Sequence, residues 1–204
     1  MNIEDLVQKI KSVARGKHRT LVGIAGPPAS GKSTLAKQIS DHIDHSLLVP
    51  MDGFHLENSV LDKMGNRDRK GAPFTFDAEG FIAMITEIKT GSNIVNVPEF
   101  DRELDQVVYN GLRVNKTHNI IIIEGNYLFL DETPWRQLHP LFDFSVLLSP
   151  ELNVIKSRLI KRWLEHGYSL DDAKIKAQQN DLPNAELILS KSLSANLALS
   201  DIQI

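Results

Sequence analysis

The sequence of 204 residues predicts an α/β fold of three layers, with a mostly parallel sheet between two layers of helices. Short apolar runs alternate along the chain with longer segments whose apolar residues recur at helical spacing. Runs that are apolar throughout are typical of strands buried on both faces of a parallel sheet. Charged residues make up 24% and apolar residues 42% of the chain, which is an ordinary globular composition. The length fits a single domain over residues 1–204.

Residues 1–16 are predicted to form an amphipathic N-terminal helix. Their apolar positions recur at helical spacing and are Ile3, Leu6, Val7, Ile10 and Val13. This pattern differs from the unbroken apolar core of a signal peptide. No stretch of the sequence is long and apolar enough to span a bilayer, so we expect a cytoplasmic protein.

Five apolar runs are the predicted strands of the sheet. They cover residues 21–25, 46–52, 120–124, 144–148 and 187–189. Three further helices are predicted between them, from Lys32 to His42, around Phe81 to Ile88, and from Glu151 to His166. Strands and helices that alternate in this way are typical of an open α/β sheet.

Two segments interrupt the alternation. Residues 53–78 are rich in polar residues and are predicted to be a long loop that shapes the substrate site. Residues 93–116 are predicted to form a small hairpin extension, because Asn110 and Gly111 lie between two strand-like segments. An Asn-Gly pair in that position is typical of a two-residue hairpin turn.

The segment that follows the first predicted strand has the pattern G-x-x-x-x-G-K-[ST]. It consists of Gly26, Pro27, Pro28, Ala29, Ser30, Gly31, Lys32, Ser33 and Thr34. Between a strand and a helix, such a loop wraps a polyphosphate with its backbone N–H groups. The lysine reaches the β- and γ-phosphate oxygens, and the serine hydroxyl binds Mg²⁺. We therefore expect a nucleoside triphosphate on this loop, with Ser33 as a metal ligand.

Two predicted strands end in carboxylates, Asp52 and Glu124. Ligands of open α/β sheets bind beyond the carboxyl ends of the strands. Phosphoryl transfer needs a metal ion that bridges phosphate oxygens and a group that orients or deprotonates the acceptor. Glu124 is placed to hold Mg²⁺ directly or through water, and Asp52 is placed to accept a proton from a substrate hydroxyl. Either acid could instead cap a helix or pair with an arginine.

Five segments together resemble the P-loop small-molecule kinases grouped as phosphoribulokinase, uridine kinase and pantothenate kinase. They are the phosphate loop and residues 51–55, 69–73, 98–102 and 123–125. The resemblance covers residues 20 to 190. Within the group, the chain looks most like the bacterial branch called uridine-kinase-like or fructose-transport-system kinases. The resemblance implies a kinase-type P-loop fold with ATP as donor. It also implies that Asp52 is the base on the acceptor hydroxyl and that Glu124 acts on Mg²⁺.

The resemblance further implies a mobile lid, predicted over residues 151–170. Kinases of the family carry arginines in the lid that close over ATP, stabilise the transferring charge and exclude water. The segment R-L-I-K-R matches this pattern and assigns that role to Arg158 and Arg162. The two arginines are four residues apart and share one face of a helix, where they could also be plain surface cations.

Candidates for the acceptor site come from the substrate loop and from the segment that starts the hairpin. They are Asp52, Phe54, His55, Arg69, Lys70, Phe100, Asp101 and Arg102. A guanidinium group of this loop could bind an acidic or phosphorylated acceptor in a bidentate pair. His55 could hydrogen-bond a substrate hydroxyl or be a structural histidine beside an aromatic ring. These residues leave the acceptor open between a sugar, a nucleoside and a pantothenate-like alcohol.

The predicted activity is transfer of the ATP γ-phosphoryl group to a hydroxyl of a small metabolite. A nucleotide-hydrolysing regulatory NTPase or GTPase switch is one alternative, although His118 stands where a guanine-reading N-K-x-D motif needs a carboxylate. A kinase acting on a nucleotide or on dephospho-coenzyme A is another. The net charge of −3 gives no general attraction to nucleic acid or anionic membranes. The expected partners are therefore ATP and a small-molecule acceptor, with the chain a monomer or homodimer.

Overall fold

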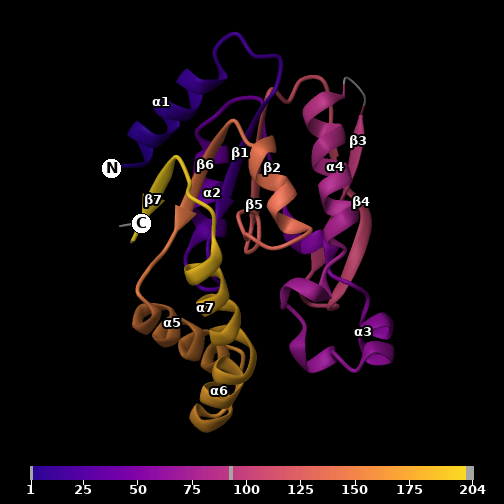
Figure 1. Cartoon of the computed structure of the whole chain (residues 1–204), viewed down its shortest axis with the longest axis vertical. Helices are drawn as coiled ribbons and strands as arrows, with labels where there is room; N and C mark the ends of the chain where they lie inside the picture. The colour runs from indigo at the N-terminus through magenta and orange to yellow at the C-terminus, as the bar shows by residue number, and fades with distance from the viewer. Residues whose placement is uncertain (1, 92–93, 201–204) are drawn as a thin grey trace.

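A five-stranded parallel sheet lies at the centre of the structure, a computed structural model that describes residues 2–91 and 94–200. The strands follow the order β2-β5-β1-β6-β7 across the sheet (Figure 1). They are β1 (Thr20–Ala25), β2 (Ser46–Pro50), β5 (Ile120–Gly125), β6 (Phe144–Leu148) and β7 (Leu197–Leu199). Residue 1 of the predicted N-terminal segment, residue 93 of the predicted hairpin segment and residues 201–204 of the predicted domain lie outside the described residues.

The two central strands are buried along their whole length, which explains why their sequences are apolar throughout. Successive side chains point to opposite faces of the sheet. On β5, Ile121 and Ile123 join one core cluster with helix α4 (Ala78–Thr90). Ile120 and Ile122 join another with helices α1 (Ile3–Ala14) and α2 (Lys32–Asp41). Helices therefore cover both faces, and the predicted three-layer α/β fold is confirmed.

The helices of the described part are mostly those that the apolar spacing predicts. They are α1 (Ile3–Ala14), α2 (Lys32–Asp41), α3 (Asn58–Met64), α4 (Ala78–Thr90), α5 (Leu152–Glu165), α6 (Leu170–Lys176) and α7 (Leu182–Lys191). The short α3 shows that the segment predicted to be a long loop has helical structure of its own. Within the described ranges, none of these helices has both the length and the apolar character that crossing a membrane requires.

The strand predicted at residues 187–189 is wrong, because these residues lie within α7. Periodicity cannot distinguish such a short apolar run in a buried helix from a strand. Ile188 packs into the core one helical turn after buried Ala185. The edge strand after β6 is β7, which pairs with it in parallel register.

The hairpin exists, but its predicted turn at Asn110 and Gly111 is wrong. The antiparallel strands β3 (Val95–Asp101) and β4 (Gln106–Val114) pair with each other, and both of these residues lie inside β4. The chain turns at residues 102–105, where the Asp101 carboxylate accepts the backbone N–H groups of Glu103 and Leu104. Glycine at position 111 instead allows the two strands to approach closely, because a Cβ atom there would lie 2.3 Å from the Glu99 carboxylate.

The carboxyl ends of the parallel strands point toward one end of the molecule. Helices α5, α6 and α7 lie there on one side, and the segment with α3 lies there on the other (Figure 1). Between α6 and α7 the chain stays helical through a π-helical turn, Ala177–Asp181. This arrangement brings segments from the middle and the end of the chain to the phosphate loop.

Candidate active site

The phosphate loop joins β1 to α2 and is shaped by its glycines. Gly31 has a φ of 93° just before α2, a left-handed conformation that favours glycine. At Gly26 a Cβ atom would lie 2.8 Å from the carbonyl oxygen of Leu148, so a larger residue does not fit. The residue before α2 provides no side-chain hydrogen bond to the first turn of that helix. The N–H groups of this turn can therefore receive a phosphate group.

Ser33 and Glu124 meet beneath the loop. The Ser33 hydroxyl donates to Glu124 Oε1 at 3.2 Å, and the Glu124 side chain is buried. Burial raises the pKa of Glu124, and the positive charge of Lys32 opposes this change. The other oxygen, Oε2, is buried without a hydrogen-bond partner among the described residues. A hydroxyl and an unsatisfied carboxylate oxygen are ligands that suit Mg²⁺.

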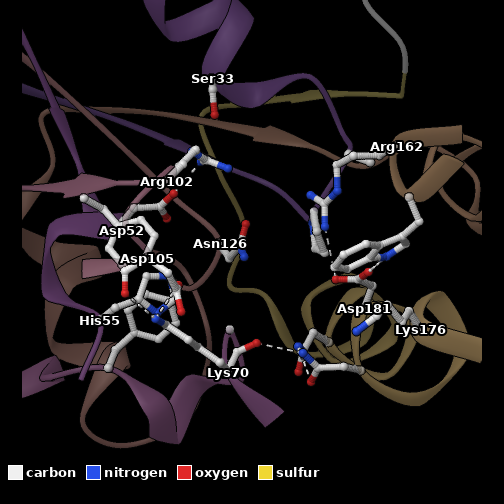
Figure 2. Close-up of a pocket in the computed structure, with 18 of the residues that line it drawn as sticks. Ser33, Asp52, His55, Lys70, Arg102, Asp105, Asn126, Arg162, Lys176 and Asp181 are labelled. Carbon is white, nitrogen blue, oxygen red and sulfur yellow. Dashed lines mark hydrogen bonds and ion pairs between the residues drawn. The ribbon is translucent and has the colours of Figure 1, made fainter. Parts of the chain in front are cut away.

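Asp52 lies in a short 3₁₀ turn, Met51–Phe54, directly after β2. Pro50 pairs with Glu124 in the parallel register of β2 and β5, so both acids lie at the same edge of the sheet. Arg102 Nη2 donates to Asp52 Oδ2 at 2.6 Å (Figure 2). Asp52 therefore pairs with an arginine, as the sequence analysis allowed for either acid. Its carboxylate nevertheless lines the same cleft as the phosphate loop.

His55 belongs to an aromatic wall beside Asp52. Its ring stacks on Phe76, with centroids 4.1 Å apart, and lies 4.8 Å from the ring of Phe100. Burial lowers the pKa of His55 to about 4, so the ring is neutral at pH 7. Its Nδ1 atom is buried without a hydrogen-bond partner in the described part of the chain. The site thus offers a neutral ring nitrogen next to the proposed base.

Lys70 extends this wall from the substrate segment, residues 53–78, which the sequence analysis predicted to be a long loop. Its ammonium group lies 2.6 Å from Asp105 Oδ1, 2.7 Å from Asn58 Oδ1 and 4.8 Å from the centroid of the Phe100 ring. Burial alone would raise the pKa of Asp105, and hydrogen bonds from Lys70 and Asn58 lower it below its ordinary value. This contact ties the substrate segment to the hairpin turn.

One cleft of about 680 Å³ connects these groups. Figure 2 shows Asp52, His55 and Arg102 on one side of it and Arg162 and Asp181 on the other. The sequence-predicted residues that line it are Pro28, Ala29, Gly31, Lys32, Ser33, Thr34, Asp52, His55, Lys70, Phe100, Arg102 and Arg162. Loop and acceptor candidates thus share one cavity.

Several predicted site residues lie outside the cleft wall. Phe54 packs edge-on against Phe81 in the core, with ring centroids 5.1 Å apart. Asp101 accepts backbone hydrogen bonds in the hairpin turn. Arg69 lies over the ring of Phe74. The other residues outside the wall are Gly26, Pro27 and Ser30 of the loop, buried Glu124, and Arg158, which contacts the Ser30 carbonyl at 3.5 Å.

The cleft also contains residues that sequence reasoning missed. They are Asp68, Gly71, Phe76, Asp105, Asn126, Trp163, Lys176, Gln179, Asn180, Asp181 and Asn184. Arg67, one of the loop cations considered for an acidic acceptor, also lines the cleft. Asn126 follows Glu124 and Gly125 at the end of β5, so the rule about strand ends could have found it. Asn180 and Asp181 come from the π-helical turn, for which the sequence carries no signal that we can identify.

Comparison with known proteins agrees with this geometry. The sequence model described as "Phosphoribulokinase / Uridine kinase family" matches residues 21–187. A crystal structure from Silicibacter sp. TM1040, called a "putative fructose transport system kinase", is 39% identical, with a TM-score of 0.92 over 97% of this chain and 98% of that chain. A "putative uridine kinase" of Schizosaccharomyces pombe is 28% identical over 98% of this chain and 91% of its own length. A pantothenate kinase of Mycobacteroides abscessus is 31% identical to this chain. The aligned region covers 71% of this chain and 48% of that protein.

Proposed function

The chain belongs to the phosphoribulokinase / uridine kinase family of small-molecule P-loop kinases, and we propose that it transfers the γ-phosphoryl group of ATP to a hydroxyl of a sugar, a nucleoside or a pantothenate-like alcohol. The family acts as phosphotransferases on hydroxyl groups. One observation carries the proposal for this chain. The phosphate loop and the Asp52 carboxylate face the same cleft, which is large enough for a nucleotide and a small acceptor.

The residues of the loop hold the donor in this proposal. Backbone N–H groups at the start of α2 bind the β- and γ-phosphates, and Lys32 neutralises their charge. Ser33 and Glu124 would hold Mg²⁺, which neutralises phosphate charge when it is bound. Arg162 faces the cleft from α5, and Arg158 reaches the loop at the carbonyl oxygen of Ser30. Both arginines would stabilise charge on the transferred group.

Asp52 acts on the acceptor. Its carboxylate accepts the proton of the substrate hydroxyl while the hydroxyl oxygen forms a bond to the γ-phosphorus. The bond between that phosphorus and the β–γ bridging oxygen breaks, and ADP leaves. Arg102 holds the Asp52 carboxylate at 2.6 Å, so an acceptor must share or displace this contact. His55 can hydrogen-bond the acceptor without adding charge, because its ring is neutral at pH 7.

The names of the relatives give an order in which acceptors are tested. The name of the 39% identical structure puts sugars first among the compounds to test, and the uridine and pantothenate kinase relatives put nucleosides and pantothenate next. We propose that the enzyme works in the cytoplasm as a monomer or homodimer. A nucleotide-driven switch is less consistent with a family whose named relatives are kinases of small molecules.

The test measures conversion of ATP to ADP with Mg²⁺ across sugars, nucleosides, pantothenate and their phosphates. Wild type is compared with Asp52→Asn and with the control Asp41→Asn. Asp41 pairs with Lys37 on the surface of α2, so its substitution removes the same charge away from the cleft. We expect acceptor-dependent turnover in wild type and Asp41→Asn, and a loss of kcat by a factor of about 10² to 10⁴ in Asp52→Asn. ATP hydrolysis that needs no acceptor and survives in Asp52→Asn would contradict the proposal and favour a switch.

A further inference from the structure

The π-helical turn Ala177–Asp181 lines the cleft on the side that also holds Arg162 (Figure 2). Its residues interrupt an otherwise continuous helix formed by α6 and α7. Such turns widen the backbone locally, change the direction of the side chains and occur often at functional sites. Here the consecutive residues Asn180 and Asp181 both line the cleft, but they contact different segments of the chain.

Asp181 contacts the lid helix α5. Its Oδ2 accepts a hydrogen bond from Trp163 Nε1 at 2.7 Å, and its Oδ1 lies 3.4 Å from Arg162 Nη2. The carboxylate is only 12% exposed, and burial raises the pKa of Asp181, which Arg162 and Trp163 oppose. A buried carboxylate is costly unless it is paired, so these contacts fix the relative positions of the two side chains. Arg162 also lies over the Trp163 ring, 5.5 Å from its centroid.

Asn180 contacts the substrate segment. Its Nδ2 donates to the carbonyl oxygen of Lys70 at 2.8 Å, and its Oδ1 accepts from Arg69 Nε at 3.3 Å. The Tyr127 hydroxyl donates to the carbonyl oxygen of Gly71 at 2.6 Å and anchors the same segment to the core. Asn180 therefore joins this segment directly to the π-helical turn.

We propose that the π-helical turn couples the substrate segment to the lid helix α5. Asp181 is the positioning residue that holds Arg162 toward the phosphoryl group. Asn180 connects the turn to residues 69 and 70. The inference rests on the proposed function. Binding at either side of the cleft then favours the arrangement that the other side needs. Thermodynamic linkage makes this effect reciprocal, so nucleotide binding alone is expected to change the dynamics of the substrate segment.

The test needs no acceptor. Amide hydrogen exchange of the peptide covering residues 67–73 is measured with and without Mg²⁺ and a non-hydrolysable ATP analogue. We expect the analogue to slow exchange there about five-fold or more in wild type. The slowing should disappear in Asn180→Ala, which removes the tie, and in Asp181→Asn, which keeps an acceptor for the Trp163 N–H but loses the charge.

Asp171→Asn is the matched control, because Asp171 lies on α6, is 90% exposed and pairs only with Lys174 among the described residues. It should behave as wild type. A second readout separates positioning from a structural role. With an alcohol that wild type phosphorylates, Asp181→Asn should lower kcat about ten-fold or more, while the analogue Kd changes less than three-fold. Asp181→Glu, which restores the charge, should recover part of kcat.

The outcomes distinguish the two proposals. If the analogue binds but slows exchange equally in wild type, Asn180→Ala and Asp181→Asn, the coupling is overturned and the proposed function stands. If exchange behaves as expected and no alcohol is phosphorylated, the proposed function fails and the coupling stands. If wild type does not bind the analogue, ATP binding itself is wrong and both fail. Equal losses of kcat, analogue affinity and melting temperature in Asp181→Asn would reduce Asp181 to a structural residue.

Discussion

The two ends of the cleft differ in how their carboxylates and lysines are paired. At the nucleotide end, formed by residues 26–34 and Glu124, the buried Oε2 of Glu124 has no hydrogen-bond partner among the described residues, and α2 starts without a side-chain cap. At the acceptor end, formed by the β2 end, the substrate segment and the hairpin turn, Asp52 pairs with Arg102 and Lys70 pairs with Asp105. The nucleotide end is thus prepared for ligands, whereas an acceptor must exchange existing contacts.

This difference has an energetic consequence. Phosphates and Mg²⁺ at the nucleotide end would satisfy groups that are costly to leave buried and unpaired. At the acceptor end, the contacts already made must be replaced by contacts of similar strength, which rejects molecules that cannot supply them. We therefore expect substitutions at the nucleotide end to affect binding and turnover together. At the acceptor end, substitutions other than that of the proposed base Asp52 should affect mainly the acceptor KM and stability.

Apart from the proposed base Asp52, the largest effect is expected from Lys32→Ala at the nucleotide end. Loss of the ammonium group removes charge compensation for the phosphates in both the ground state and the transition state. We expect kcat/KM for ATP to fall about 10²- to 10³-fold, with weaker binding of an ATP analogue. Lys37→Ala, on the exposed side of α2, is the control and should remain within two-fold of wild type. Normal turnover in Lys32→Ala would contradict the assignment of the phosphate loop.

At the acceptor end, His55 should make the stability of the protein depend on pH. The pKa of His55 in the folded protein is about 4, below its ordinary value of 6.5, so the unfolded chain binds more protons between these pH values. The contribution of His55 to stability is therefore fully present above pH 6.5 and is lost as pH falls toward 4. Relative to His55→Phe, wild type should lose about 2 kcal/mol of unfolding free energy between pH 7 and pH 5.

Urea unfolding at the two pH values measures this difference. Phenylalanine can keep the stacking on Phe76 but does not titrate, so it isolates the proton. Parallel pH dependence in wild type and His55→Phe would mean that His55 is not held neutral.

The same contrast separates what the sequence could predict from what it could not. The phosphate loop is contiguous, and the buried strands around it carry apolar runs, so both were predicted from local pattern and are found in the structure. Asp52 and Glu124 were singled out because strand ends converge in a parallel sheet, and the structure places both at that edge. These features depend on backbone rules that act within a few residues or across neighbouring strands.

The acceptor end depends on contacts between distant segments. Lys70 meets Asp105 from 35 residues away, and Arg69 meets Asn180 from 111 residues away. A π-helical turn and a hairpin turn displaced from Asn110 decide which side chains face the cleft. Residue types along the sequence do not determine these placements, because tertiary packing selects among several local conformations that are all allowed. The substrate candidates Phe54 and Asp101 were misplaced for that reason.

A smaller effect on turnover is expected from Glu124→Gln, which keeps the shape of the side chain and removes its charge. Burial raises the pKa of Glu124, so burial disfavours the ionised form of this side chain. We therefore expect the variant to be at least as stable as wild type but to need about ten-fold more Mg²⁺ for half-maximal turnover. Magnesium titration and thermal melting measure the two quantities. An unchanged magnesium requirement would remove Glu124 from the metal site.

The smallest effect is expected from Asp105→Asn at the acceptor end. Lys70 would lose its carboxylate partner but keep Asn58 and the Phe100 ring, and the half-exposed carboxylate is partly screened by water. We expect a loss of about 1 kcal/mol of stability and a rise of a few-fold in the acceptor KM, with the ATP KM unchanged. Asp62 lies on α3 and is an exposed partner of Arg67, so Asp62→Asn is the control. It should change neither the stability nor the acceptor KM. If Asp105→Asn raised the KM for ATP as much as that for the acceptor, the two ends of the cleft would not be separate, because a contact confined to the hairpin turn would then be acting on the phosphate loop.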